Sequence, residues 1–148
     1  MYKNILIPTD GSELAEKAVQ AGTGYARETG AKVVLFTAVP EYRVPGESEI
    51  MARKHVGSIF EYEQEAERNA KAVLEHAVAA ARAANVDFQT DYAMADQPYE
   101  AIIAAAKRHG CDAIFMASHG RKGLPALWYG SQTREVLTHS DIPTLVYR

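Results

Sequence analysis

The sequence has a single cysteine, Cys111, so no disulfide can form within the chain. This residue opens an apolar run, which favours an inert buried thiol over a redox centre. No apolar run approaches the roughly 18 residues of a membrane span, and no block of five like charges occurs. With a formal net charge of −3, neither membrane insertion nor nucleic-acid binding is expected. No signal-peptide pattern precedes the first apolar run, so the expected compartment is the cytoplasm.

Several catalytic and nucleotide motifs are also missing. The sequence contains neither the G-x-x-x-x-G-K-[ST] loop nor the G-x-S-x-G elbow. Gly22-Thr23-Gly24 lies inside a helical pattern and is followed by Arg27 where a dinucleotide fingerprint needs glycine, so close helix packing explains it better. The histidines have no zinc-ligand spacing. Ser118 and His119 are neighbours on one loop, a poor arrangement for a nucleophile and its base, and a hydrolase would need a base that the sequence does not offer.

Five segments have the patterns of β-strands. Three are continuous apolar runs, typical of strands buried on both faces, one alternates apolar with polar residues, typical of an edge strand, and the last is a short apolar closing strand. These segments are 5–7, 32–39, 86–92, 111–116 and 143–147. Helical spacing predicts four helices between them, of which the second is long, with an alanine-rich face, and the last begins at Ser131. Residues 41–55 have no clean period and predict a loop.

The alternation of strands and helices predicts an α/β fold with three layers, because right-handed crossovers make successive strands parallel and place helices on both faces. We expect one domain over residues 1–148, with an open, doubly wound, parallel five-stranded sheet. The alternating third strand belongs at an edge, which favours the strand order 3-2-1-4-5. In that order the chain reverses direction between strands one and four, and a crevice opens at their carboxyl ends. Ligand chemistry is therefore expected in the loops after Ile7 and Met116.

The loop after Met116 is rich in glycine and leads into the last helix. Glycine lets backbone amides approach a bulky anion, and a helix starting at Ser131 would aim unpaired N–H groups at the same place. Arg121 and Lys122 add positive charge. Glycine content alone is equally typical of a surface loop that only turns the chain. The position beside the predicted crevice favours the first interpretation, in which phosphate is the occupant.

Three segments resemble the universal stress protein family, and the resemblance extends over essentially the whole chain. They are the opening strand and loop ILIPTDGS at 5–12, the loop MASHG followed by nine residues and Gly130-Ser131, and the closing IPTLV at 142–146. ATP-binding members of that family have a glycine, two residues, a second glycine, nine residues, and then glycine with serine or threonine. The second and third glycines correspond to Gly120 and Gly130. The first corresponds to Ala117, whose methyl group matters if that residue has positive φ or touches the ligand.

The resemblance implies a site for ATP, ADP or AMP, with Mg²⁺ held through the phosphates. Asp10 would bond a ribose hydroxyl, although Asp10 and Glu13 also have the spacing of a helix capping box, and Asp10 or Ser12 can cap the first turn of the helix. Val39 would contact adenine. The residues that the resemblance places around the nucleotide are Pro8, Thr9 and Asp10 at the adenine and ribose end, Met116, Ala117, Ser118, His119, Gly120 and Arg121 along the ribose and first phosphates, and Gly130, Ser131, Gln132 and Thr133 at the outer phosphates.

Two functions are compatible with these features. The first is a universal stress protein that binds an adenine nucleotide as a regulatory ligand, with at most slow ATP hydrolysis, because no residue presents itself as a positioned base. The second is a dimeric interaction module of the same fold that binds no nucleotide and regulates a partner protein. Ala117 favours the second. In both, the apolar closing strand 144–147, at a sheet edge with little charge, predicts a homodimer.

Overall fold

The computed structural model describes residues 1–40, 56–118 and 128–148. Residues 41–55, predicted to form a loop, lie outside this range. Strands and helices alternate along the described chain, as the sequence predicts. The elements are β1 (Asn4–Pro8), α1 (Glu13–Thr29), β2 (Lys32–Val39), α3 (Val56–Ala83), β3 (Phe88–Met94), α4 (Pro98–Arg108), β4 (Ala113–Ala117), α5 (Trp128–His139) and β5 (Thr144–Tyr147).

The five strands form one sheet in the order β3-β2-β1-β4-β5. All neighbouring strands run parallel, and Ile5 at the centre pairs with Val33 on one side and Ala113 on the other. The predicted strand order is confirmed, with the alternating strand β3 at one edge and β5 at the other. The first three strands form one half of the sheet, and β4 and β5 form the other half. The two halves meet at β1 and β4, so the carboxyl ends of these two strands adjoin each other.

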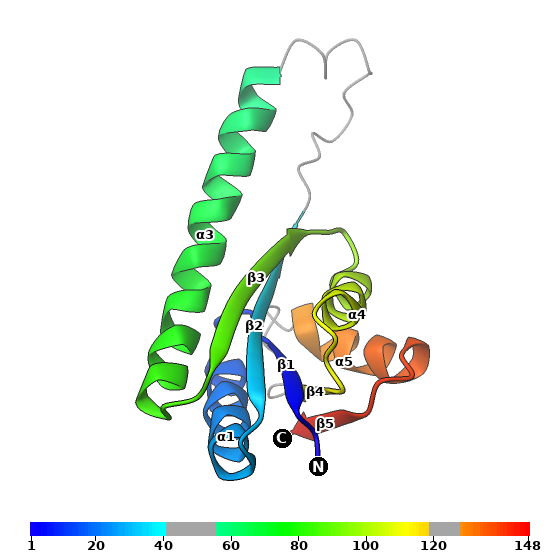
Figure 1. The fold of residues 1–148 in the computed structure, drawn as a ribbon. Coiled ribbons are helices and arrows are strands. Elements are labelled where there is room, and N and C mark those ends of the chain that lie inside the picture. The colour runs from blue at the N-terminus through cyan, green and yellow to red at the C-terminus, as the bar shows by residue number, and fades with distance from the viewer. Residues whose placement is uncertain (41–55, 119–127) are drawn as a thin grey trace.

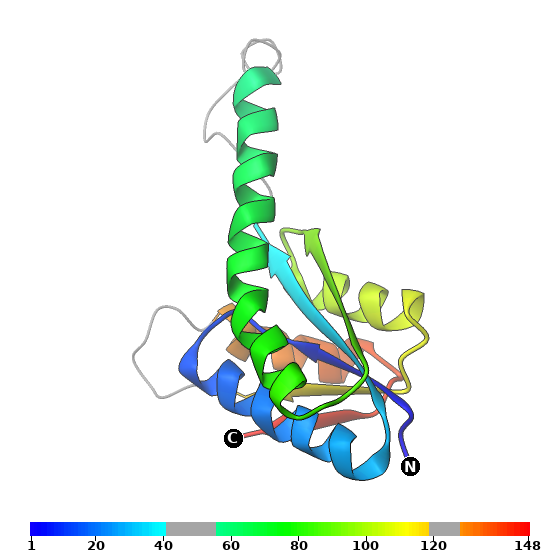
Figure 2. The same ribbon diagram turned by 60° about the vertical axis from the view of Figure 1, so that its left-hand side comes forward.

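Helices cover both faces of the sheet, and the predicted three layers are present. Figures 1 and 2 show α1 and α3 on one face and α4 and α5 on the other. Successive β1 residues alternate between the two cores: Ile5 and Ile7 pack against α1 and α3, whereas Leu6 packs against α4 and α5. All three side chains are fully buried. Each such burial contributes roughly 2 kcal/mol to folding, which explains why β1 is a continuous apolar run.

Helix α3 is longer than the sheet that it covers, and its N-terminal part extends past the carboxyl ends of β2 and β3 (Figures 1 and 2). Its alanine-rich face is buried, as predicted, through Ala66, Ala70, Ala77 and Ala81. Because alanine has a short side chain, the helix can approach the sheet closely. In the projecting part, Ala66 and Ala70 pack against Val39 at the end of β2.

Several predicted boundaries differ from those of the structure by one to three residues. Strand β3 is Phe88–Met94 instead of 86–92, because its pairing with β2 begins at Phe88 and continues to Met94. Strand β4 continues to Ala117, which pairs with Tyr147. Helix α5 begins at Trp128 rather than Ser131. A glycine such as Gly130 costs a helix only about 1 kcal/mol, a weak preference that tertiary contacts can override.

The edge strand β3 is attached to α4 by a charged cluster around Asp91. The Asp91 carboxylate accepts hydrogen bonds from the Arg108 guanidinium, and His109 Nε2 lies 2.8 Å from Asp91 Oδ2. Burial raises the pKa of Asp91, but the hydrogen bonds to His109 and Arg108 outweigh this effect and hold the pKa below its usual value. The edge of the sheet is therefore secured by ionic contacts as well as by apolar packing.

Gly22 lies where α1 crosses the sheet, and the prediction of close helix packing is confirmed for this residue. A Cβ atom at Gly22 would lie 2.6 Å from Ile7 Cδ1, whereas a Cβ at Gly24 would meet nothing within 4 Å.

We expect Gly24→Ala to raise the free energy of unfolding by about 0.5–1 kcal/mol, through helix propensity. The free energy of unfolding of Gly22→Ala should be about 1–3 kcal/mol lower than that of Gly24→Ala, because overpacking offsets the same gain in helix propensity. Urea denaturation of the pair measures the difference, and equal stabilities would contradict the packing role.

Candidate functional site

The turn after β1 lies at one side of the predicted crevice and is closed by its own side chains. The Thr9 N–H donates to the Phe36 carbonyl at 2.8 Å, which ties the turn to β2. Thr9 Oγ1 accepts from the Gly11 N–H, and Asp10 Oδ1 accepts from the Ser12 N–H at 2.9 Å. Gly11 has φ +78°, a conformation that glycine adopts without strain. The sharp bend places Thr9 and Asp10 directly at the carboxyl end of β1.

Of the two caps that the sequence offers for α1, the structure has Ser12, and the capping box of Asp10 and Glu13 does not form. The N-cap of α1 is Ser12, whose Oγ accepts from the Ala15 N–H at 3.2 Å. Asp10 lies two residues before the cap and closes the turn, an arrangement that short acidic side chains commonly adopt. Glu13 instead forms an exposed ion pair with Lys17. Asp10 thus closes the turn at the carboxyl end of β1 and does not cap the helix.

The end of β4 lies at the other side of the predicted crevice. Ala117 is the last residue of this strand, and the Ser118 N–H donates to the Tyr147 carbonyl at 2.7 Å. The Ala117 side chain is buried and belongs to the apolar cluster on the α1 and α3 face. Among the described non-glycine residues only Asn85 has positive φ, so Ala117 has an ordinary strand backbone. Its methyl group therefore fills part of the core, and nothing in its conformation requires glycine.

Two residues of α5 that were predicted to hold outer phosphates are buried and bonded to the protein. Gln132 Oε1 accepts from the Tyr99 N–H at 2.8 Å, and Thr133 Oγ1 donates to the Ala117 carbonyl at 2.7 Å. Both side chains belong to the small set of buried polar residues. They connect α5 to α4 and to the end of β4.

The remaining predicted residues divide into two groups. Pro8 and Met116 are buried strand residues, and Val39 packs on α3, so a ligand in the crevice would meet mainly the backbone of Pro8 and Met116. Gly130 and Ser131 lie in the first turn of α5. His119, Gly120 and Arg121 lie outside the described residues. The structure thus places the end of β1, with Pro8, Thr9 and Asp10, next to the end of β4, with Met116, Ala117 and Ser118. Val39 ends β2, which lies on the other side of β1.

Comparison with known proteins agrees with this architecture. The model of the universal stress protein family matches residues 1–148. The chain belongs to the universal stress protein family. It is 30% identical to universal stress protein MJ0577 of Methanocaldococcus jannaschii over 100% of this chain and 96% of that one, and 29% identical to YxiE of Bacillus subtilis over the full length of both.

Solved structures of the family have the same fold. The structure of MJ0577 superposes with a TM-score of 0.78 at 26% identity, covering 99% of this chain and 96% of the other. A universal stress protein from Archaeoglobus fulgidus, solved in complex with dAMP, superposes with a TM-score of 0.69 at 19% identity, covering 99% and 98%. The latter similarity concerns the fold alone.

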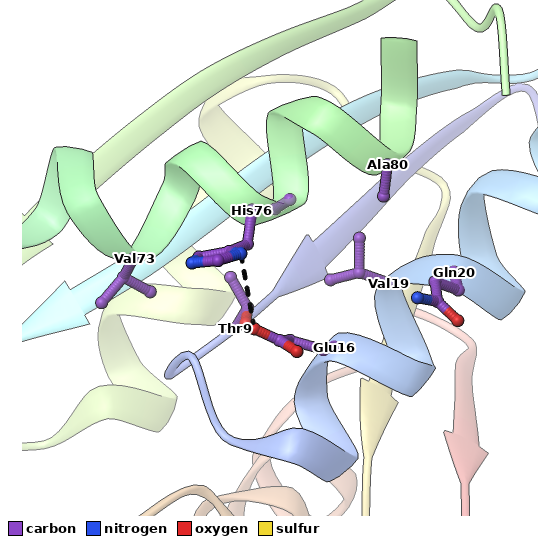
Figure 3. Close-up of a pocket in the computed structure, with 8 residues that line it drawn as sticks. Thr9, Glu16, Val19, Gln20, Val73, His76 and Ala80 are labelled. Atoms are coloured by element: carbon purple, nitrogen blue, oxygen red, sulfur yellow. Dashed lines mark ion pairs between the residues drawn. The ribbon is translucent and has the colours of Figure 1, made fainter. Parts of the chain in front are cut away.

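This universal stress protein has a pocket that sequence reasoning did not find. It lies between α1 and α3, and its lining includes Thr9, Glu16, Val73 and His76 (Figure 3). His76 Nδ1 lies 3.9 Å from Glu16 Oε1, and both side chains are substantially exposed. Each residue alone has the pattern of a solvated helix position, so no signal in the sequence joins them. Through Thr9, the pocket adjoins the turn after β1.

The described residues offer little other chemistry. They contain no group of three or more His, Cys, Asp or Glu side chains arranged to hold a metal ion. Within the same ranges, no helix is long and apolar enough to cross a membrane. Burial raises the pKa of the Cys111 thiol to about 11, so this side chain stays protonated near neutral pH and is a poor nucleophile.

The position of Ala117 leads to a stability prediction. Ala117→Gly should lower the free energy of unfolding by about 1–2 kcal/mol, because it removes a buried methyl group and frees the backbone of a strand. Ala93→Gly on the edge strand β3 is the control, since it has the same backbone cost at a partly buried position. Urea denaturation compares them. If Ala117→Gly were no more destabilising than Ala93→Gly, the core role of the methyl group would be refuted.

Proposed function

We propose that this universal stress protein binds ATP, or a related adenine nucleotide, as a regulatory ligand of a stress response in the cytoplasm. The site is the crevice at the carboxyl ends of β1 and β4. The observation that carries the proposal is the conformation of Ala117: the residue that departs from the nucleotide-binding pattern has its methyl group in the core and an ordinary backbone. Family membership supports the choice of ligand, since a related protein was solved with dAMP.

The groups around the crevice suit a nucleotide. The turn of Thr9 and Asp10 brings backbone and a carboxylate to one side, and a carboxylate oxygen is a good acceptor for a ribose hydroxyl. On the other side, the first turn of α5 contains Gly130 and Ser131, where unpaired helix N–H groups favour phosphate oxygens. In this proposal Mg²⁺ binds through the phosphates, because the described part of the chain has no metal-ligand cluster of its own.

A regulatory ligand fits this site better than a substrate does. Among the described residues proposed for the site, Asp10 alone carries a carboxylate, and its Oδ1 already accepts from the Ser12 N–H. Rapid hydrolysis needs a group that orients and deprotonates the attacking water. We therefore propose at most slow turnover, with the bound nucleotide as the signal.

Nucleotide binding is tested by thermal unfolding with and without ATP and Mg²⁺. Ligand at 100 times its dissociation constant should stabilise the protein by roughly 2.7 kcal/mol. Gly130→Val should abolish the increase in unfolding temperature caused by ATP, because it places a branched side chain in the first turn of α5. Gly24→Ala, on the open side of α1, should retain this increase. Ala117→Gly should leave the dissociation constant for ATP within about twofold of its value in the unmodified protein. No shift with saturating ATP, ADP or AMP would refute the proposal and favour an interaction module that binds no nucleotide.

We also propose that the protein acts as a homodimer, joined through the edge strand β5, and that this form engages a regulatory partner protein. Thr144–Tyr147 forms the outer strand of the sheet, and the Val146 side chain is exposed. An apolar edge with unpaired backbone groups is a template for strand pairing.

Sedimentation velocity tests the dimer. Val146→Lys should shift the protein toward monomer, because a charge on the pairing edge disfavours association. Thr90→Lys places the same charge at an exposed position on the opposite edge strand β3 and should leave the dimer intact. A monomer at all concentrations of the unmodified protein, or dissociation by Thr90→Lys instead, would contradict pairing through β5.

A further inference from the structure

The pocket between α1 and α3 combines polar and apolar walls that the proposed nucleotide site does not use. Its volume is about 90 Å³. A cavity needs roughly 15 Å³ to hold one water molecule, so this pocket has room for a molecule of about six non-hydrogen atoms. The lining includes Glu16 and Gln20 of α1 and Val73 and His76 of α3, and Thr9 lies between the two helices (Figure 3).

Thr9 presents a buried hydroxyl to this pocket. The residue is 1% exposed, and its Oγ1 accepts a hydrogen bond from the Gly11 N–H. A hydroxyl also has one proton to donate, and within the described part of the chain the Thr9 hydroxyl has no acceptor for it. A buried donor without an acceptor is costly, so the inner end of the pocket is suited to a ligand that brings an acceptor atom.

The side chains nearer the surface also have hydrogen-bonding capacity for a ligand. His76 Nδ1 and Glu16 Oε1 are 3.9 Å apart, which is too far for a hydrogen bond. In the ranges that the structure describes, neither of these side chains nor the Gln20 amide has another hydrogen-bond partner. The Glu16 side chain is 42% exposed, so a ligand can reach its carboxylate from solvent.

The charge of the pocket favours a cation. The lining residues all lie in the described part of the chain, and among them Glu16 alone carries a permanent charge, whereas His76 is charged only when protonated. A carboxylate attracts an ammonium group through charge-assisted hydrogen bonds and repels an anion. A small anion is therefore a poor occupant.

The wall between these polar groups is apolar. Val19 and Ala77 are buried there, and Val73 and Ala80 complete the surface. An alkyl chain placed against these side chains leaves water, which favours binding in proportion to the apolar area covered. A ligand of matching chemistry has a short hydrocarbon chain with a cationic group and a separate oxygen acceptor.

We propose that this pocket is a second ligand site, which binds a small aliphatic amine that also bears an oxygen acceptor. The ammonium group pairs with the Glu16 carboxylate, the alkyl chain lies against Val19 and Ala77, and the oxygen accepts from the Thr9 hydroxyl. The site goes beyond nucleotide binding, because its ligand is held between α1 and α3 and needs no nucleotide.

A matched set of small compounds tests these contacts in the full chain without nucleotide. 3-Amino-1-propanol has both polar groups, 1-butanol replaces the ammonium group by methyl, and butylamine replaces the hydroxyl by methyl. Both amines are protonated near neutral pH, since aliphatic ammonium groups have pKa values of about 10. The amide chemical shifts of Val19 and Ala77 measure binding.

3-Amino-1-propanol should saturate these shifts with a dissociation constant of about 1 mM, which is within the affinity limit for a ligand of this size. Loss of the charge should weaken 1-butanol by about tenfold or more, and loss of the acceptor should weaken butylamine by about threefold.

Two pairs of variants test the position of the site. Glu16→Gln should weaken 3-amino-1-propanol by about tenfold, whereas Glu75→Gln, the same change at an exposed position of α3 outside the pocket, should leave its affinity within about twofold. Ala80→Leu should abolish saturation because the larger side chain fills the pocket. Ala79→Leu, on the exposed side of the same helix, should bind as the unmodified protein does.

The proposal is overturned if 3-amino-1-propanol fails to saturate the shifts of the unmodified protein at about 20 mM, or if 1-butanol binds equally well. Equal weakening by Glu16→Gln and Glu75→Gln would also overturn it, because the amine would then respond only to the net charge of the protein. Circular dichroism establishes that each variant is folded, and the compound series decides the matter in the unmodified protein. Since no nucleotide is present, failure to bind ATP would refute the proposed function and leave this site standing.

Discussion

The structure depends on the pairing of β1 with strands on both sides while helices cover both of its faces. Ile5, Leu6 and Ile7 are fully buried, and their backbone groups bond to β2 and β4. A parallel sheet of this kind needs right-handed crossovers, so the helices on the two faces come from the two halves of the chain. Where the halves meet, the carboxyl ends of β1 and β4 adjoin each other. The candidate site is a consequence of this topology, independent of the side chains later placed in it.

The polar side chains around that edge mostly serve the scaffold. Thr9 closes the turn after β1, Gln132 caps α4, and Thr133 holds the end of β4. Among the residues that the structure describes at this edge, the groups left for a ligand are therefore largely backbone amides and carbonyls, together with the Asp10 carboxylate. Backbone donors held in place by buried hydrogen bonds suit an anion such as phosphate, and they supply no base for catalysis. The same arrangement explains why binding without rapid chemistry is the function proposed.

Much of the fold was predictable because burial on both faces leaves a clear signal in the sequence. Continuous apolar runs identified the central strands, and the alternation around Asp87, Gln89 and Asp91 identified the edge strand. The boundaries were harder, since they depend on register. Strand β4 extends to Ala117 because Tyr147 pairs with it across the sheet, and no local property of alanine shows this. Likewise, Ser12 and Asp10 both suit a helix cap, and the backbone decides between them.

The sequence by itself determined the fold class, the strand order and the place of the candidate site. Each depends on periodicity and chain order, which are local or topological properties. The tertiary structure alone decided what the individual side chains do. The Ala117 methyl lies in the core, Gln132 reaches the start of another helix, and Glu16 and His76 meet across a pocket. These contacts join residues far apart in the chain, and their energies depend on distance and burial that only the packed helices and sheet establish.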